Sequence, residues 1–153
     1  MSIKWLKTDV KKRIMEKRAV LFVDDDEIVL KSIEKSIKDE PYDIYFAESG
    51  KDALEILKQE EVHVIIVDIA MPGMDGLELL KIVKKEYPKI VSMVISGYAQ
   101  SADAMMVLQQ EGVYRFIPKN WTFDEELRTV IQRAIDTYNL QIEHEDMATE
   151  LER

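Results

Sequence analysis

The sequence predicts an α/β fold, a doubly wound parallel sheet of five strands with helices on both faces. Short apolar runs alternate with amphipathic helical patterns through the middle of the chain, which is the pattern of successive βα units. Two of these runs end on aspartates, Asp24 and Asp68. Open α/β folds bind ligands outside the carboxyl ends of their strands, so these aspartates mark the expected site.

The boundaries of the expected elements follow from the apolar pattern and from residues that begin or end helices. Ser49 with Asp52, and Thr122 with Glu125, resemble capping boxes, and Pro88 stops a helix. The helix over residues 26–38 is expected to bury the side that carries Ile28, Val29, Ile33 and Ile37. The expected strands are residues 19–23, 42–47, 62–67, 90–95 and 113–117, and the expected helices are residues 26–38, 49–59, 75–87, 101–111 and 122–138.

The chain is expected to be one domain, residues 19–138, with two short extensions. Residues 1–18 carry seven Lys or Arg residues and two acidic residues, a net charge of +5. Their apolar residues recur at near-helical spacing, which predicts an extra N-terminal helix: Ile3, Leu6, Val10 and Ile14. Residues 139–153 are expected to extend the last helix as an acidic extension or linker. Because the two extensions have opposite charge, they are expected to pair, within one chain or across a homodimer. The alternatives are that the basic helix lies on an anionic membrane surface, or that both extensions are solvated tails.

The composition argues against several classes of protein. Hydrophobic residues make up 46% of the chain, and the absence of cysteine excludes a disulfide framework and a thiolate metal site. The net charge of −9 argues against direct nucleic-acid binding, because phosphate neutralisation needs a basic surface. No apolar run approaches the roughly 20 residues of a membrane helix. A cytoplasmic protein without a membrane partner is therefore expected.

Asp68 is the candidate nucleophile. It ends an apolar run and is followed closely by the turn sequence Met71-Pro72-Gly73. A carboxylate that attacks phosphorus forms an acyl phosphate, so it must lie at an accessible strand end with neutralising charge nearby. The structural alternative is that Asp68 only caps this turn.

Asp24 and Asp25 are the candidate metal ligands. They follow the first apolar run, and parallel strands bring their carboxyl ends to the same edge as Asp68. Mg²⁺ prefers oxygen ligands, with few protein carboxylates and the remaining positions filled by water and phosphoryl oxygens. The alternative is a solvated helix N-terminus whose acids interact favourably with the helix dipole.

Ser96 and Lys119 complete the candidate site. Ser96 ends the fourth apolar run and Lys119 follows the fifth. A hydroxyl and an ammonium group at this edge would both donate hydrogen bonds to phosphoryl oxygens. Either residue alone is unspecific, so their value lies in the combination with the aspartates.

The combination resembles the response-regulator receiver domain over residues 19–138: carboxylates after strands one and three, a hydroxyl after strand four and a lysine after strand five. The resemblance implies a flavodoxin-like sheet with strand order 2-1-3-4-5. It also implies that Asp68 accepts a phosphoryl group from a histidine kinase or phosphotransfer protein. Mg²⁺ would be held by Asp24, Asp25, Asp68 and the backbone carbonyl of Ala70.

The resemblance further implies a switch. Ser96 and Lys119 would bind the phosphoryl oxygens, and Phe116 would be the aromatic residue that turns inward as Ser96 moves. The face formed by the fourth helix, the fifth strand and the last helix would then control a partner or a downstream output domain. Such a protein modifies its own aspartate in a two-component system and is not an enzyme with a separate substrate.

Two other functions remain open from the sequence. In a haloacid-dehalogenase-type phosphatase, Asp24 would be the nucleophile of an Asp-x-Asp motif, but Asp68 and its turn would be unexplained. A pseudo-receiver would bind partners without phosphorylation. Asn120, where receivers commonly have proline, favours the pseudo-receiver weakly, whereas the intact set of site residues argues against it.

Overall fold

The protein is described here from a computed structural model that covers residues 16–68, 76–96, 115–118 and 124–151. The helix expected over residues 101–111 and residues 1–15 of the expected N-terminal helix lie outside these residues, whereas residues 16–18 are described and are not helical. Along the chain the elements are β1 (Ala19–Val23), α2 (Glu27–Ile37), β2 (Asp43–Ala47), α3 (Gly50–Gln59), β3 (Val64–Asp68), α4 (Gly76–Glu86), β4 (Val91–Ser96), β5 (Arg115–Pro118) and α6 (Asp124–Leu151).

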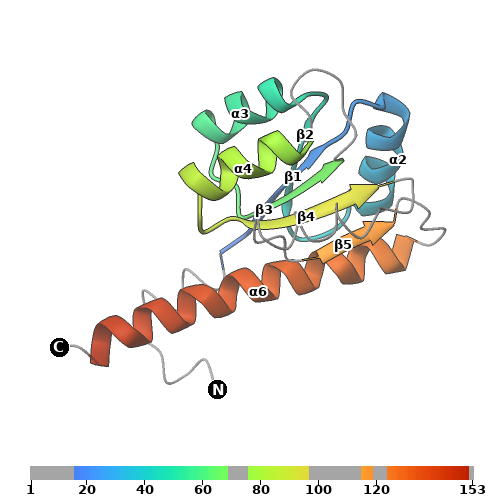
Figure 1. Cartoon of the computed structure of the whole chain (residues 1–153). Coiled ribbons are helices and arrows are strands. Elements are labelled where there is room, and N and C mark those ends of the chain that lie inside the picture. The colour runs from blue at the N-terminus through green and yellow to red at the C-terminus, as the bar shows by residue number, and fades with distance from the viewer. Residues whose placement is uncertain (1–15, 69–75, 97–114, 119–123, 152–153) are drawn as a thin grey trace.

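The strands form one parallel sheet in the order β2-β1-β3-β4-β5 (Figure 1). β3 lies near the centre and pairs with β1 from Val20↔Val64 to Val23↔Val67. β5 is an edge strand of the sheet and pairs with β4, and the last pair is Ser96↔Pro118. The prediction of a flavodoxin-like parallel α/β fold is confirmed. All carboxyl ends of the strands consequently lie at one edge of the sheet.

Alternate residues of the strands β1 to β4 pack into two apolar layers, one on each face of the sheet. Val20 and Phe22 belong to the layer that contains α2 and α6, whereas Leu21 and Val23 belong to the layer that contains α3 and α4. β3 divides its side chains in the same way between the two layers. This two-sided burial explains why the strands read as continuous apolar runs and not as alternating ones. Figure 1 shows the helices on both faces.

The predicted buried side of α2 was wrong at one residue. Ile28 is 79% exposed, whereas Leu30, Ile33 and Ile37 are buried. These buried residues recur at intervals of three and four and define one stripe, and Ile28 falls on the opposite side of the helix. Asp26 caps the helix by accepting a hydrogen bond from the Ile28 N–H at 2.9 Å, so the exposed isoleucine is held in the first turn.

The predicted cap at Ser49 is confirmed, because its hydroxyl accepts a hydrogen bond from the Asp52 N–H at 3.1 Å. Thr122 of the second expected cap lies outside the described residues. The last helix, α6, extends to Leu151 as expected, and its C-terminal half projects past the amino ends of the strands (Figure 1). No helix in the described part of the chain has the length and hydrophobicity needed to cross a bilayer.

Candidate functional site

Asp68 and Asp24 lie at the carboxyl edge of the sheet, where the sequence predicted them. Asp68 is the last residue of β3 and pairs with Ile95 of β4. Asp24 directly follows β1, and its N–H donates to the carbonyl oxygen of Ala47 at 3.1 Å, which continues the ladder toward β2. Both aspartates are almost fully buried, with 4% and 2% exposure respectively.

The backbone after β1 holds the acidic residues in a fixed turn. Asp24 Oδ1 accepts a hydrogen bond from the Asp26 N–H at 2.9 Å, and Asp26 in turn caps α2. Asp25 lies between these two hydrogen-bonded aspartates in the sequence and is exposed to solvent at the rim of the site. The turn therefore assigns different roles to adjacent aspartates: Asp26 starts a helix, and Asp24 and Asp25 face the site.

The side chains of Asp24, Asp25 and Asp68 come together as one cluster. One carboxylate oxygen from each lies within 4.8 Å of the others. Like charges this close in a partly buried place repel one another. A hard divalent cation such as Mg²⁺ removes this repulsion and prefers carboxylate oxygens as ligands, so the donor set fits the metal that the sequence predicted.

Of the remaining candidate residues, the structure describes the backbone of Ser96 and of Phe116. Ser96 is the last residue of β4 and directly follows Ile95, the register partner of Asp68. Phe116 lies in β5 and pairs with Val94. For Ser96 and Phe116 the description is limited to the backbone. Lys119 and Ala70 lie outside the described residues, so their predicted roles stay predictions.

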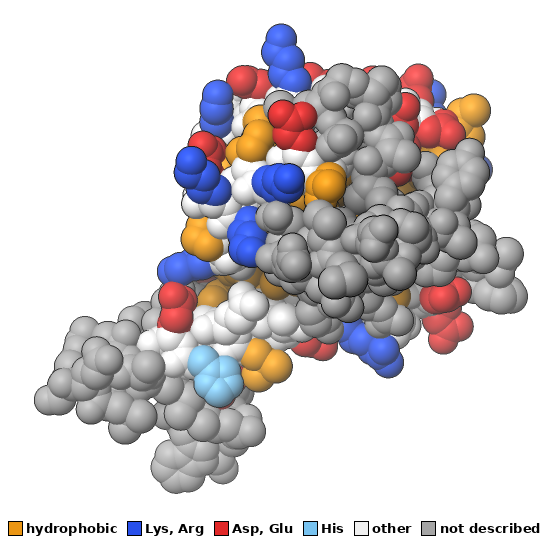
Figure 2. Space-filling view, in the orientation of Figure 1, with side chains coloured by type: hydrophobic (Ala, Val, Ile, Leu, Met, Phe, Trp, Pro, Cys, Tyr) orange, Lys and Arg blue, Asp and Glu red, His pale blue; other side chains and the backbone are white. Residues whose placement is uncertain are grey.

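The surface over α3 and α4 carries charges of both signs. Figure 2 shows basic and acidic side chains interspersed there, with apolar side chains exposed singly between them. This mixed surface has no continuous basic footprint of the kind that neutralises nucleic-acid phosphates.

Residues 20–132 match the response regulator receiver domain family. The chain belongs to that family. The match runs from β1 into the first part of α6 and so includes the residues of the acidic edge. It decides against the haloacid-dehalogenase-type alternative, whereas the pseudo-receiver alternative lies within the same family and remains to be tested.

Relatives of this receiver domain include transcriptional regulators. The chain is 36% identical over 126 residues to the hydrogenase transcriptional regulatory protein HoxA of Cupriavidus necator, which covers 82% of this chain and 26% of HoxA. It is 36% identical over 127 residues to the DNA-binding transcriptional regulator NtrC of Proteus hauseri, covering 83% of this chain and 27% of NtrC. The chain thus spans about a quarter of the length of the curated relatives that it matches.

A solved receiver has the same fold. The response regulator receiver domain protein (CheY-like) of Methanospirillum hungatei JF-1 has a TM-score of 0.76 and 25% sequence identity with this chain. The likeness covers 82% of this chain and 99% of that one. The likeness therefore includes nearly the whole of that receiver domain.

Proposed function

We propose that this receiver domain accepts a phosphoryl group on Asp68 and uses it as a signal in a two-component system. The observation that carries the proposal is the position of Asp68 at the end of β3, with the Asp24 and Asp25 carboxylates within 4.8 Å. Membership of the receiver family supports the same role. The donor is a phosphohistidine of a sensor kinase or phosphotransfer protein.

The proposed transfer forms a mixed anhydride. An Asp68 carboxylate oxygen attacks phosphorus, the phosphorus–nitrogen bond to the donor imidazole breaks, and the imidazole nitrogen leaves with the bonding electron pair and takes up a proton. Asp68 needs no general base, because an ionised carboxylate has no proton to lose. Ser96, the last residue of β4, and Lys119, which follows β5 in the sequence, are proposed to donate hydrogen bonds to the phosphoryl oxygens.

Asp24, Asp25 and Asp68 are the residues that would hold Mg²⁺, with the Ala70 carbonyl as the fourth protein ligand of the proposal. Bound there, the cation supplies positive charge against the three carboxylates and the phosphoryl oxygens. Asp24 is buried and fixed by its hydrogen bond to the Asp26 N–H, so it contributes a preformed ligand. Asp25 is exposed and contributes charge at the rim.

Replacing Asp25 with asparagine is expected to have opposite effects on stability without and with Mg²⁺. Without the metal, Asp25→Asn raises the melting temperature, because one member of a repelling carboxylate cluster becomes neutral. Mg²⁺ at about ten times its Kd stabilises the wild-type protein by about 1.4 kcal/mol, and the variant shows less of this gain. Thermal unfolding followed by circular dichroism, with and without Mg²⁺, measures both effects.

Asp26→Asn is the matched control for this experiment. It removes the same charge one residue away, and asparagine is as good an N-cap as aspartate. We expect Asp26→Asn to keep the full stabilisation by Mg²⁺. If both variants lose the same part of the stabilisation by Mg²⁺, the ion is attracted by the net charge of this edge of the sheet and is not bound by Asp25.

The proposed signal is a change of the face that contains residues 101–111, β5 and α6. Phosphorylation recruits Ser96, Phe116 turns inward, and the face shifts between two arrangements that partners distinguish. The partner is an output domain in the same longer protein or a separate protein. Direct nucleic-acid binding is not proposed for this acidic chain, although one relative is named as a DNA-binding regulator.

Beryllofluoride, which stands in for the phosphoryl group on Asp68, is expected to shift backbone amide resonances from residue 96 to residue 121. These residues follow β4 and include β5, so a shift there reports the proposed switch. A two-dimensional amide spectrum with Mg²⁺, with and without beryllofluoride, measures it. The Asp68→Asn variant should show no change. Shifts confined to the loop after Asp68 would mean that the domain binds the group without passing the signal on.

A further inference from the structure

The C-terminal half of α6 has a charge pattern that a lone helix does not favour. Residues 136–151 contain five acidic residues and no Lys or Arg: Asp136, Glu143, Glu145, Asp146 and Glu150. Acidic groups at the C-terminal end of a helix interact unfavourably with its dipole, and isolated helices of this length are marginal in water. The helix nevertheless extends to Leu151, beyond the sheet (Figure 1). A basic partner segment would supply what this part of the helix lacks.

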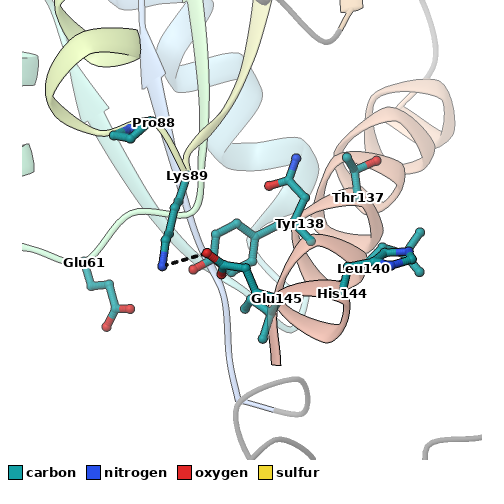
Figure 3. Close-up of a pocket in the computed structure, with 10 residues that line it drawn as sticks. Glu61, Pro88, Lys89, Thr137, Tyr138, Leu140, His144 and Glu145 are labelled. Carbon is teal, nitrogen blue, oxygen red and sulfur yellow. Dashed lines mark ion pairs between the residues drawn. The ribbon is translucent and has the colours of Figure 1, made fainter. Parts of the chain in front are cut away.

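A groove runs along this part of α6. It has a volume of about 770 Å³ and lies between residues 137–145 of α6, the Pro88–Lys89 loop and Glu61. Lys89 Nζ lies 3.3 Å from Glu145 Oε1, which ties α6 to the body of the domain. In Figure 3, Tyr138 and Glu145 point from α6 toward Lys89, whereas Leu140 and His144 point to the other side of the helix. The groove is therefore lined by residues from both sides of α6, and Tyr138 and Glu145 lie on the side that faces the body of the domain.

Ile142 shows that this side of α6 is covered. Its side chain is only 4% exposed, although it belongs to neither of the two apolar layers formed by the described residues. Leu140, two residues earlier, is 54% exposed. The contrast defines a buried side that includes Tyr138 and Ile142 and an open side that includes Leu140.

The chain enters the domain beside this buried side. Arg18 Nε donates to Asn139 Oδ1 at 2.9 Å, and the Arg18 guanidinium carbon lies 5.1 Å from the centroid of the Tyr138 ring. The Tyr138 ring meets the His63 ring edge-on, with 4.8 Å between centroids. Arg18 itself is 5% exposed. The residues before Arg18 therefore start from the middle of α6, next to the groove.

His63 holds the residue after Arg18 in place. Its Nδ1 accepts a hydrogen bond from the Ala19 N–H at 2.9 Å. Burial lowers the pKa of His63, against a smaller opposing effect of Glu61, so the ring is neutral near pH 7 and keeps Nδ1 as an acceptor. Ala19, and with it the start of β1 next to Arg18, is thus held in place by a side chain that precedes β3.

The sequence of residues 1–15 complements the covered side of α6. Five basic residues and one acidic residue give it a net charge of +4. Its apolar stripe from Ile3 to Ile14 would span about 16 Å as a helix, similar to the length of α6 from residue 139 to residue 150. The basic positions 4, 7 and 11 recur at steps of three and four, as do the acidic positions 143, 146 and 150.

The two charged stripes also lie on matching flanks. In helical projection, positions 4, 7 and 11 lie clockwise of the apolar stripe of residues 3–14, viewed from the N-terminus. Positions 143, 146 and 150 lie clockwise of Tyr138 and Ile142 on α6. Flanks of the same hand face each other only when two helices run antiparallel. A segment that starts at Asn139 and runs along α6 toward residue 150 has this same antiparallel direction.

We propose that residues 3–14 dock as a helix, antiparallel, on residues 138–150 of α6 in the same chain. The apolar stripe covers Tyr138 and Ile142, and the lysines at positions 4, 7 and 11 face the acids at positions 143, 146 and 150. A link of only three residues joins the docked segment to the anchored Arg18, so the segment meets α6 of its own chain at a high effective concentration. Docking keeps α6 helical to Leu151 and covers its acidic C-terminal end.

The first test compares Val10→Asp with Thr8→Asp in the full-length chain. Both substitutions add the same charge to the same segment, but position 10 lies on the apolar stripe and position 8 on the opposite side. Hydrogen exchange read by mass spectrometry should show at least tenfold faster exchange of the amides of residues 139–150 in Val10→Asp, and no change in Thr8→Asp. Unchanged protection of residues 64–68 in β3 verifies that the domain stays folded. Equal exchange in both variants would overturn the proposal.

The second test reverses the charges. Lys7→Glu with Lys11→Glu should accelerate exchange in residues 139–150, and adding Glu143→Lys with Asp146→Lys should restore the protection. Failure of the second pair to restore it would overturn the proposed pairing. Light scattering at the same protein concentrations decides between one chain and two. Protection that is lost when a dimer dissociates on dilution would assign the docking to a second copy and overturn the proposal for a single chain.

Discussion

With Mg²⁺ and acetyl phosphate, the wild-type protein is expected to gain one phosphoryl group, and the Asp68→Asn variant is expected to gain none. The reason is chemical, because the amide of asparagine has no anionic oxygen to attack phosphorus. Asparagine has the same shape as aspartate, so the buried end of β3, where Asp68 is 4% exposed, is disturbed as little as possible. Intact-mass spectrometry measures the gain, and fragmentation locates it.

Asp26→Asn is the control for this experiment too, because it removes a carboxylate from the same edge without touching the cluster of Asp24, Asp25 and Asp68. We expect it to be phosphorylated like the wild-type protein. A phosphoryl group found on Asp68→Asn would place the nucleophile elsewhere. A wild-type protein that stays unmodified with acetyl phosphate and with phosphohistidine donors would identify the chain as a pseudo-receiver.

The fold and the acidic edge could be predicted from the sequence because both depend on patterns that the sequence shows directly. Strands buried on two faces read as apolar runs, and residues that end such runs must lie at one edge of a parallel sheet. Asp24 and Asp68 were found in this way, and their oxygens meet with that of Asp25 within 4.8 Å. The strand order was not contained in these patterns and came from the family resemblance.

Contacts between distant segments could not be predicted in the same way. The hydrogen bond from Arg18 to Asn139 joins residues 121 positions apart, and neither residue has a local signal. His63 lies inside the apolar run predicted as the strand of residues 62–67, and its role as an acceptor for the Ala19 N–H depends on the pairing of β1 with β3. Ile28 was predicted on the buried side of α2, but the buried stripe includes Leu30 in its place. Which residues of α2 are buried depends on how the helix lies on the sheet.

Ile131→Ala is expected to destabilise the domain by about 2–5 kcal/mol, because truncating a fully buried isoleucine removes its apolar contacts and leaves a cavity. Ile131 is 0% exposed and packs in the layer between α6 and the sheet, together with Ile66 and Met93. For a chain of this size, a loss near 3 kcal/mol lowers the melting temperature by about 6–12 °C. Denaturant and thermal unfolding measure the two quantities.

Leu140→Ala is the matched comparison, because it truncates a side chain of similar size on the same helix. Leu140 is 54% exposed and points away from Lys89 (Figure 3), so we expect a change within about 0.5 kcal/mol. A large loss at Ile131 and none at Leu140 would show that α6 is attached through the side that faces the sheet, and that the side of Leu140 contributes little to the stability of the domain. Equal losses at the two positions would contradict this division of α6, and would mean that its open side packs against something in solution.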